Sequence, residues 1–548
     1  MDLNRRDAKT PRENKGCLTR RLSHSFSSLP LFFLALCLCV SAVNLSCSSK
    51  PIDLRTLVPA ETLVYLETND LAAALQPIVD SKPFTEVAKS KPDFSALKGV
   101  QLAVAVTGFE TSEEKLTDEH SVGRVQPHFV AIADTHAWNF QAVGFAEKKL
   151  GAFVENIYDS VPTVEKSDKN GGKYFIWTAK DGRKAYALVM DSIIYFGNDE
   201  TAIDKCLAVK QGEADSIIKT GKVQPADPAT LASGYVSIDG IAQIANIASL
   251  QFASQSSDDS EVQSAIAGIL PQLLRSSITE ISWAATKTEQ GIEDKYKIGM
   301  PPEIANVFSE TMTPGDSVGS ELPDYLPQGA RTASVYSFRN PRVAWRSLLV
   351  LAQKQLPPST GSLIGPFSSA LFEPYGISDP DHFLSSVGPA VATANDAEDG
   401  DKPIVVTPIV NAEDLKASVA KDAVTVKGHD QPVFDEGIIG VSYLNGRVHV
   451  GDANTVVGAV AKETVQSEER KPYLKGYLSN STAPITTYSY DNKIAVQIRD
   501  MFRIPGGEDD KAGSVAITET RFTRSGMERR TLSDFGLIGS IIAQLAQN

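Results

Sequence analysis

The second half of this 548-residue chain repeats the strand order of the first half, and this internal repeat limits the fold more than any other feature. The clearest repeated block is a β-hairpin followed by a helix. Its strands cover residues 185–189 and 193–197 in the first half, and residues 439–444 and 448–451 in the second half. Four such blocks keep the same order in both halves, which chance strand patterns rarely achieve. The sequence therefore predicts a duplicated domain.

The other three blocks are shorter. In the first of them, Tyr65 lies four residues before Asn69, and Tyr336 lies four residues before Asn340, so the two tyrosines are expected to be equivalent. Asparagine, aspartate or proline at the end of such a strand can start a helix. The two remaining blocks match residues 235–239 with 487–491, and residues 278–283 with 515–519.

Within each copy, tight turns join the strands, which favours a mostly antiparallel sheet. Turns such as Asn170-Gly171 and Asn445-Gly446 suit two-residue hairpins because these residues tolerate positive φ. Strands are predicted over residues 173–178, 184–190 and 193–197. Apolar spacing predicts helices over residues 145–158, 200–210, 414–421 and 534–547. The predicted fold class is α+β: two tandem copies of a mostly antiparallel sheet domain, with helices packed on one face.

Length and composition fit this division, because 548 residues exceed the usual size of one core, and 42% hydrophobic with 22% charged residues is typical of globular proteins. The predicted parts are a leader (1–46), a tether (47–56), a first repeat (57–312), a linker (313–324) and a second repeat (325–548). Polar or Pro/Gly-rich segments predict loops over residues 111–124, 254–261, 357–380 and 396–401.

The leader resembles an export signal. A basic segment precedes an apolar stretch over residues 29–43, which is long enough for a signal core but short for a membrane-spanning helix. Cys47 follows Ser46 as in the lipobox of bacterial lipoproteins, although Asn44 and Leu45 depart from that pattern. The sequence predicts an exported protein, facing the periplasm or the cell surface and anchored to the membrane through a lipid on Cys47. Ordinary signal cleavage, an uncleaved anchor and a twin-arginine signal at Arg20-Arg21 stay open.

Processing at Cys47 would change both cysteine content and charge. Only Cys206 would remain as a free thiol, in a helical pattern that predicts a buried apolar role rather than a nucleophile. The first 46 residues hold seven basic and three acidic residues, so the rest would carry 46 basic and 64 acidic residues, a net charge of −18. A chain this acidic is expected to repel nucleic acid, so no nucleic-acid partner is predicted.

No catalytic residue and no cofactor is predicted. Ser-x-x-Lys occurs at Ser112, Ser216 and Ser418, as in penicillin-recognising enzymes, and Lys219 begins a Lys-Thr-Gly. The order is wrong for that family, because the serine should precede the Lys-Thr-Gly strand by a long stretch. The usual motifs of P-loop nucleotide sites and zinc proteases are absent from the sequence.

No metal site is predicted either. The eight-residue spacing of His120, His128 and His136, with Asp134 nearby, imitates a ligand set, but a polar loop and strand ends favour surface histidines. An acidic loop lacks the closing glutamate of a calcium loop, whose place Val406 takes; its acidic residues are Asp396, Glu398, Asp399 and Asp401. Gly197 and Gly451 precede helices whose acidic neighbours oppose anion binding.

The segment Leu57-Val58-Pro59-Ala60-Glu61-Thr62-Leu63-Val64-Tyr65-Leu66, the Asn69-Asp70-Leu71 helix start and the later strand over residues 102–106 resemble an uncharacterised family of exported bacterial proteins. Members begin their folded part with a Pro-Ala-Asp-Thr-like segment and have no established activity. The resemblance implies a similar layout for much of the mature chain and no catalytic residue.

Three classes of function are consistent with the sequence. The favoured hypothesis is a non-enzymatic envelope protein of binding or scaffolding type, with the membrane and other envelope proteins as partners. The second is a carrier that holds a lipid or other apolar ligand between a curved sheet and its helices. The third is a cryptic hydrolase whose residues come from distant strands.

Overall fold

A computed structural model describes the chain from residue 52 to residue 545, with gaps. The described ranges are residues 52–115, 121–158, 160–225, 227, 229–256, 260–315, 321–327, 329–362, 364–395, 402–427, 433–464, 474–479, 481–507 and 512–545. The leader, the anchor candidate Cys47, His120 and the acidic loop 396–401 lie outside the described residues. Among the described helices, none combines the length and the hydropathy needed to cross a bilayer.

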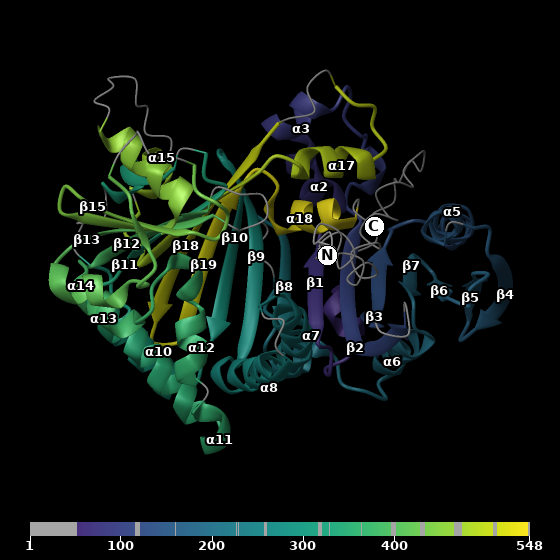
Figure 1. Cartoon of the computed structure of the whole chain (residues 1–548). Helices are drawn as coiled ribbons and strands as arrows, with labels where there is room; N and C mark the ends of the chain where they lie inside the picture. The colour runs from purple at the N-terminus through teal and green to yellow at the C-terminus, as the bar shows by residue number, and fades with distance from the viewer. Residues whose placement is uncertain are drawn as a thin grey trace, which may run out of the picture.

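The described strands form one 19-stranded sheet across the whole molecule (Figure 1). The first half contributes β1 (Val64–Thr68), β2 (Gln101–Lys115), β3 (Ser121–Asp134), β4 (Thr163–Lys169), β5 (Gly172–Thr178), β6 (Lys184–Met190), β7 (Ile193–Gly197), β8 (Thr230–Val236), β9 (Glu280–Thr288) and β10 (Gly291–Gly299). The second half contributes β11 (Thr332–Ser337), β12 (Ala390–Asn395), β13 (Pro403–Pro408), β14 (Val424–Thr425), β15 (Ile439–Leu444), β16 (Arg447–Asp452), β17 (Ile485–Asp491), β18 (Ser514–Thr523) and β19 (Gly526–Ser533).

Strand pairing follows the same plan in both halves. β1 lies between β2 and β8, and β11 lies between β12 and β17. β3 pairs with β7 as β13 pairs with β16, and the hairpins β9–β10 and β18–β19 lie beside β8 and β17. Among the described strands only β14 and β15 pair in parallel. The α+β class and the mostly antiparallel sheet are therefore confirmed.

The two halves share one sheet, so the predicted division into two tandem sheet domains is not confirmed. β10 pairs with β19 from Ile292 opposite Ser533 to Gly299 opposite Gly526. In each half the last strand of the final hairpin would otherwise leave its backbone N–H and C=O groups without partners, and the two strands satisfy each other.

The helices of the first half are α2 (Leu71–Asp80), α3 (Lys82–Val87), α4 (Asn139–Phe145), α5 (Gly151–Ile157), α6 (Glu200–Gln211), α7 (Ile238–Ser256), α8 (Ser260–Ser277) and α9 (Pro302–Thr311), with a π-helical turn at Ala146–Leu150. Those of the second half are α10 (Pro341–Gln355), α11 (Pro358–Gly361), α12 (Ile364–Ala370), α13 (Pro380–Ser386), α14 (Ala412–Ser418), α15 (Ala453–Thr464), α16 (Lys475–Leu478), α17 (Ile494–Met501) and α18 (Gly536–Leu545).

Helices cover both faces of the sheet, so the prediction of a single helical face is wrong. In β2, Leu102 and Val104 pack in the cluster that contains α2, whereas Ala103 and Ala105 pack in the cluster that contains α6. Successive strand residues point to opposite faces, so a strand that is apolar throughout needs a cover on each side. We name these sides the α2 face and the α6 face.

The same two faces continue into the second half. Residues directly opposite each other in paired strands point to the same face of the sheet. A series of such partners runs from Val104 of β2, across β10 and β19, to Tyr336 of β11. Val104 and Tyr336 therefore point to the same face. Tyr336 packs with α10, α13 and α14, which therefore lie on the α2 face. Val335 packs with α15, which lies on the α6 face.

This register corrects the predicted match between Tyr65 and Tyr336. The helix caps are Asp70 for α2 and Asn340 for α10, so the match is shifted by one residue. Tyr65 packs with α6 on one face, and Tyr336 packs on the opposite face. A one-residue shift moves a strand side chain to the other face of the sheet. The counterpart of Tyr65 is therefore Val335.

The structure confirms the predicted hairpin strands but not all of the predicted loops. Strands over residues 184–190 and 193–197 are confirmed as β6 and β7. The loop predicted over residues 111–124 is wrong, because β2 and β3 stay paired from Thr111 opposite Val125 to Lys115 opposite Ser121. The segment 357–380 also carries the helices α11 and α12 rather than a loop alone.

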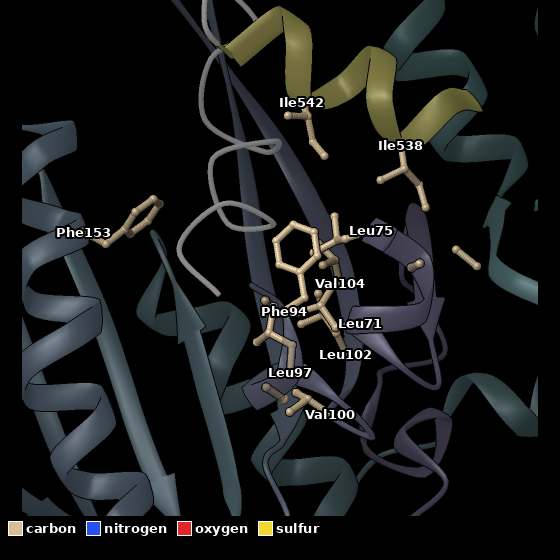
Figure 2. Close-up of a cluster of buried hydrophobic side chains, with 14 of the residues drawn as sticks. Leu71, Leu75, Phe94, Leu97, Val100, Leu102, Val104, Phe153, Ile538 and Ile542 are labelled. Atoms are coloured by element: carbon tan, nitrogen blue, oxygen red, sulfur yellow. The ribbon is translucent and has the colours of Figure 1, made fainter. Parts of the chain in front are cut away.

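The core on the α2 face of the first half draws on both ends of the described chain. Figure 2 shows Leu71 and Leu75 of α2 beside Phe94 and Leu102, with Ile538 and Ile542 of α18 above them. α18 comes directly after β19 and packs on α2, and α17 packs on α3. The C-terminal helices thus close the first half.

Candidate functional site: an apolar cavity beneath α10

A cavity of about 710 Å³ lies on the α2 face of the second half. Its floor is the sheet, through residues such as Tyr336, Val391 and Phe522. Its walls are α8, α9, α10 and α13. The volume falls within the range of about 300–1,000 Å³ that is typical of ligand sites.

Local sequence sets the position of α10 over this floor. Asn340 accepts a hydrogen bond from the Val343 amide, and Pro341 occupies the first turn, so the helix begins directly after β11. Ala344, Leu348 and Leu351 recur at helical spacing and all line the cavity.

Neighbouring segments contact α10 on two sides. On one side, the hydroxyls of Thr311 in α9 and Ser347 in α10 lie 2.9 Å apart. On the other side, the Trp345 ring meets the Phe372 ring edge-to-face with centroids 5.0 Å apart. α10 is therefore held at both flanks while its inner side borders empty space.

The first half supplies one wall. Leu270, Leu273 and Leu274 of α8 line the cavity, and Ile269 packs with Leu356 and Ile364 of the second half. The residues after β10 continue the wall through Met300 and α9. Because both halves build the cavity, neither half alone would enclose it.

The lining is apolar. None of the lining residues, all of which the structure describes, is charged or a histidine. Its polar side chains are Ser277, Thr393, Tyr336 and Tyr375, and burial raises the pKa of Tyr375 above its ordinary value. The remaining lining residues are Leu270, Leu273, Leu274, Ile278, Met300, Ile304, Phe308, Met312, Phe338, Pro341, Ala344, Trp345, Leu348, Leu351, Ala352, Leu371, Phe372, Ile377, Phe383, Leu384, Val391, Val405, Ile485, Phe522 and Met527.

Two lining residues are only partly covered. Leu348 of α10 and Leu371 both line the cavity, and 38% and 42% of their surfaces are exposed. A side chain that borders an empty space keeps part of its apolar surface without a packing partner.

A charged group lies next to the same helix. Asp381 of α13 accepts hydrogen bonds from both Arg342 and Arg346, with the shortest contacts at 2.6 Å and 2.5 Å. These bonds, with that of Arg342 the larger, hold the pKa of the Asp381 carboxyl well below its ordinary value. Asp379, two residues before Asp381, acts on Arg342 as a second negative charge.

Two other cavities are more polar. One of about 520 Å³ lies under α17 and α18, near Asp294 and Arg529. Asp294 accepts hydrogen bonds from the Trp283 ring and the Leu537 amide, and burial raises its pKa to about 6. The second cavity, about 250 Å³, lies near Glu67 and Gln101. Glu67 already accepts hydrogen bonds from Tyr65 and Ser233.

The cysteine and histidine candidates lie apart from the apolar cavity. Cys206 is fully buried in the cluster of α6, and burial raises the pKa of its thiol, which fits a packing role. His128 lies 3.2 Å from Asp199, and His136 lies 3.4 Å from Asp134. Among the described residues no group of three metal-ligating side chains comes together.

The Ser-x-x-Lys candidates do not form serine–lysine pairs in the part of the chain that the structure describes. The Ser418 hydroxyl is buried and donates to the Leu415 carbonyl, whereas Lys421 is exposed. Lys219 pairs instead with Asp215 at 2.6 Å. Gly197 and Gly451 precede helices whose first amides bond to Asp199 and Asp452.

Sequence reasoning missed the cavity residues because they come from segments far apart in the chain. One local signal was present. The helix over residues 341–355 is apolar on more than one side, with Val343 and Val350 exposed and Ala344 and Leu351 buried. A helix of this kind has more apolar surface than contact with a single core would cover.

Comparisons with known proteins add little to this picture. No family model and no curated protein matches the chain. A solved structure described as crystal form IV of TP0453 shares 10% sequence identity, over 48% of this chain and 86% of that chain, with a TM-score of 0.24. A TM-score this low carries no argument about fold or function.

Proposed function

We propose that this chain is an exported, lipid-anchored envelope protein that carries an apolar ligand, such as a lipid acyl chain, in the cavity beneath α10. The observation that carries the proposal is a cavity of about 710 Å³ whose lining contains no charged side chain. Protein interiors are normally packed to the density of organic crystals, so an apolar space of this size is uncommon without a ligand.

Burial of apolar surface would drive binding. Each buried CH₂ group contributes about 0.8 kcal/mol, so a long acyl chain gains enough to offset the cost of association. The lining offers the hydroxyls of Ser277, Thr393, Tyr336 and Tyr375 but no charged side chain that would select an ionised head inside. Selection by shape and apolarity fits a carrier.

The alternatives are less well supported. A scaffold that only presents sheets to a partner has no use for an open internal space. A hydrolase would bring a nucleophile, a base and a carboxylate into one cleft, and the lining holds neither histidine nor carboxylate. The anchor at Cys47 and the attachment to the envelope rest on the sequence alone.

The duplication belongs to the same proposal. The shared pairing plan of β1 and β11 supports descent from one repeated unit, with the second copy keeping the ligand site and the C-terminal helices filling the first. Domain boundaries at residues 57–312 and 325–548 then mark sequence repeats rather than separate folding units.

Native mass spectrometry of the full chain, purified gently from its own envelope, tests the function. We expect a noncovalent mass that is lost on activation, in addition to any lipid attached to Cys47. Ala352→Trp fills the cavity from α10 and should remove that mass, while Val350→Trp on the exposed side of the same helix should keep it. A wild-type chain free of noncovalent mass that also binds no added lipid would end the proposal.

A further inference from the structure

Resting on the proposed apolar cargo, we propose that the ligand is an amphiphile with an uncharged, hydroxyl-rich head, a sugar or a glycerol group. Its apolar chain lies in the cavity beneath α10, and its head binds to Tyr296 and Arg529. Both residues line the cavity of about 520 Å³ under α17 and α18, which we name the polar cavity. The two cavities then form one site for an amphiphile.

The two cavities meet on the α2 face, where β10 pairs with β19. Ile298 of β10 lines the polar cavity, and its direct partner Met527 of β19 lines the cavity beneath α10. Ile281 of β9 is the other partner of Ile298, and it also lines the polar cavity. Directly opposite residues have Cβ atoms about 4.5–5.5 Å apart. A single row of side chains therefore separates the two spaces.

No helix covers that row completely. Ile281, Ile298 and Met527 are all half-buried. Ile292 of the same strand β10, which lies against Gly536 at the start of α18, is by contrast only 2% exposed. A partly uncovered apolar row lets an apolar chain cross from one cavity to the other.

Tyr296 and Arg529 lie at this border. The two residues are direct partners in β10 and β19. Arg529 comes two residues after Met527, so both point to the α2 face with Cα atoms about 6–7 Å apart. Thr520 lies between Arg529 and Ile485, a residue that also lines the cavity beneath α10. A head attached to a chain in that cavity is therefore within reach of both side chains.

Both side chains keep unused hydrogen-bonding groups. Arg529 is exposed and Tyr296 is half-buried, and neither side chain forms a hydrogen bond or an ion pair within the part of the chain that the structure describes. The guanidinium group can donate up to five hydrogen bonds, and the phenol can donate and accept. Thr531, two residues after Arg529, adds a hydroxyl to the same lining, 2.9 Å from that of Thr518. Such a set suits a head with several hydroxyl groups.

The charges of the polar cavity favour an uncharged head. Its lining contains the guanidinium group of Arg529 and the carboxylates of Asp294 and Asp491, so it offers no positive excess for an anion. Both carboxylates already accept hydrogen bonds. Asp294 accepts from the Trp283 ring and the Leu537 amide, and Asp491 accepts from two amides at the start of α17. A cationic head would instead meet Arg529 at the border of the two cavities, so hydroxyl groups fit better than either ion.

Calorimetry with the delipidated full chain tests the inference. The probes, each below its critical micelle concentration, are dodecyl glucoside, monododecanoylglycerol, dodecanol, dodecyl phosphate and dodecylammonium. We expect the glucoside, the glycerol ester or both to bind about five- to twenty-fold more tightly than dodecanol and either ion, as one or two added hydrogen bonds allow. The tighter of the two identifies the head as sugar or glycerol. Glucose alone should show no measurable binding, and glucose that binds as well as dodecyl glucoside would overturn the inference in favour of a free sugar site.

Two variants separate head binding from packing. Tyr296→Phe removes only the hydroxyl, and Arg529→Met removes the guanidinium group while it keeps an apolar stem. Each should reduce the ratio of hydroxyl-rich to dodecanol affinity several-fold. Arg524→Met serves as the matched control, because Arg524 is an exposed cation in the turn between β18 and β19 and lines neither cavity. It should leave the ratio as in wild type.

The outcomes distinguish the two proposals. Dodecanol, dodecyl phosphate or dodecylammonium that binds wild type as tightly as both hydroxyl-rich probes would overturn the uncharged head and leave the apolar carrier intact. A ratio that stays at the wild-type value in both variants, or an equal loss of all affinities, would overturn the assignment to Tyr296 and Arg529. Failure of every amphiphile to bind wild type would instead overturn the proposed carrier function.

Discussion

On the α2 face of the sheet, the region beneath α2 in the first half is filled, whereas the region beneath α10 in the second half is hollow, although the strands below share one pairing plan. In the first half, the Phe502 ring meets those of Phe94 and Phe84 at an angle, with centroids 5.6 Å and 6.4 Å apart, in the same buried cluster as the leucines that Figure 2 shows. In the second half, α10 covers a cavity of about 710 Å³. Strands with the same pairing plan can therefore lie beneath either a packed core or a cavity.

The difference arises from the segment that comes after the first helix of each half. After α2, the chain turns back through α3 and brings Phe84 and Phe94 inward. After α10, which is five residues longer than α2, the chain continues into α11 and α12, and Leu356 and Ile364 of this segment join a small buried cluster with Ile269 of α8. A longer helix whose next segment is displaced outward leaves the space beneath it empty.

The largest expected effect is on the filled side. Phe502→Ala removes a ring that is 5% exposed and touches two other aromatic rings, so we expect a loss of about 3–5 kcal/mol in the free energy of unfolding. Urea denaturation monitored by circular dichroism measures it. A loss below about 1 kcal/mol would show that this side is also loosely packed, and the comparison would fail.

Strand pairings within a hairpin were predictable from the sequence, and the pairing between the two halves was not. The hairpin of β6 and β7 was predictable because apolar runs flank the turn at Asp191, which adopts a positive φ of 57°. The β10–β19 pairing was not, because Glu293, Lys295 and Lys297 give β10 the pattern of a solvated strand while its partner lies more than 200 residues away. Glu293 in fact pairs with Arg530 of β19.

The cavity could not be predicted from local sequence patterns either, because its lining comes from distant segments. Leu270, Phe308, Leu348 and Met527 are ordinary core residues by pattern, and only their assembly leaves a space between them. Periodicity reports which side of an element is apolar, not whether the facing element fills the gap. The sequence allowed the hypothesis of an apolar site between sheet and helices, but it did not identify the residues of that site.

A second prediction concerns the pH dependence of the unfolding free energy, which reports on the contact between Asp294 and α18. Burial raises the pKa of Asp294 from 3.8 to about 6 while it holds the Leu537 amide. The folded state then binds this proton more tightly than the unfolded state, so the contribution is fully present below about pH 4 and is lost as pH rises through about 6. We expect the unfolding free energy of wild type to fall by about 2–3 kcal/mol relative to Asp294→Asn between pH 4 and pH 7.

Urea titrations of both proteins at pH 4 and pH 7 give this difference, and the subtraction removes the contribution of every group shared by the two chains. A difference that stays constant across the range would mean that Asp294 is solvated in the folded state. α18 would then close the first half less tightly than the buried cluster around Ile538 and Ile542 implies.

The smallest effect belongs to the hollow side. Leu351 is 8% exposed and lines the cavity, so part of its surface has no packing partner to lose. Truncation to alanine costs a transfer term plus a term for new empty space, and here the space already exists. In the delipidated chain we therefore expect Leu351→Ala to cost about 1–2 kcal/mol, less than Phe502→Ala. With an amphiphile bound, the side chain would regain partners and the cost should grow, so urea denaturation in both states separates an empty cavity from a compact core. Equal costs in the two states, both near that of Phe502→Ala, would show that the second half is packed like the first.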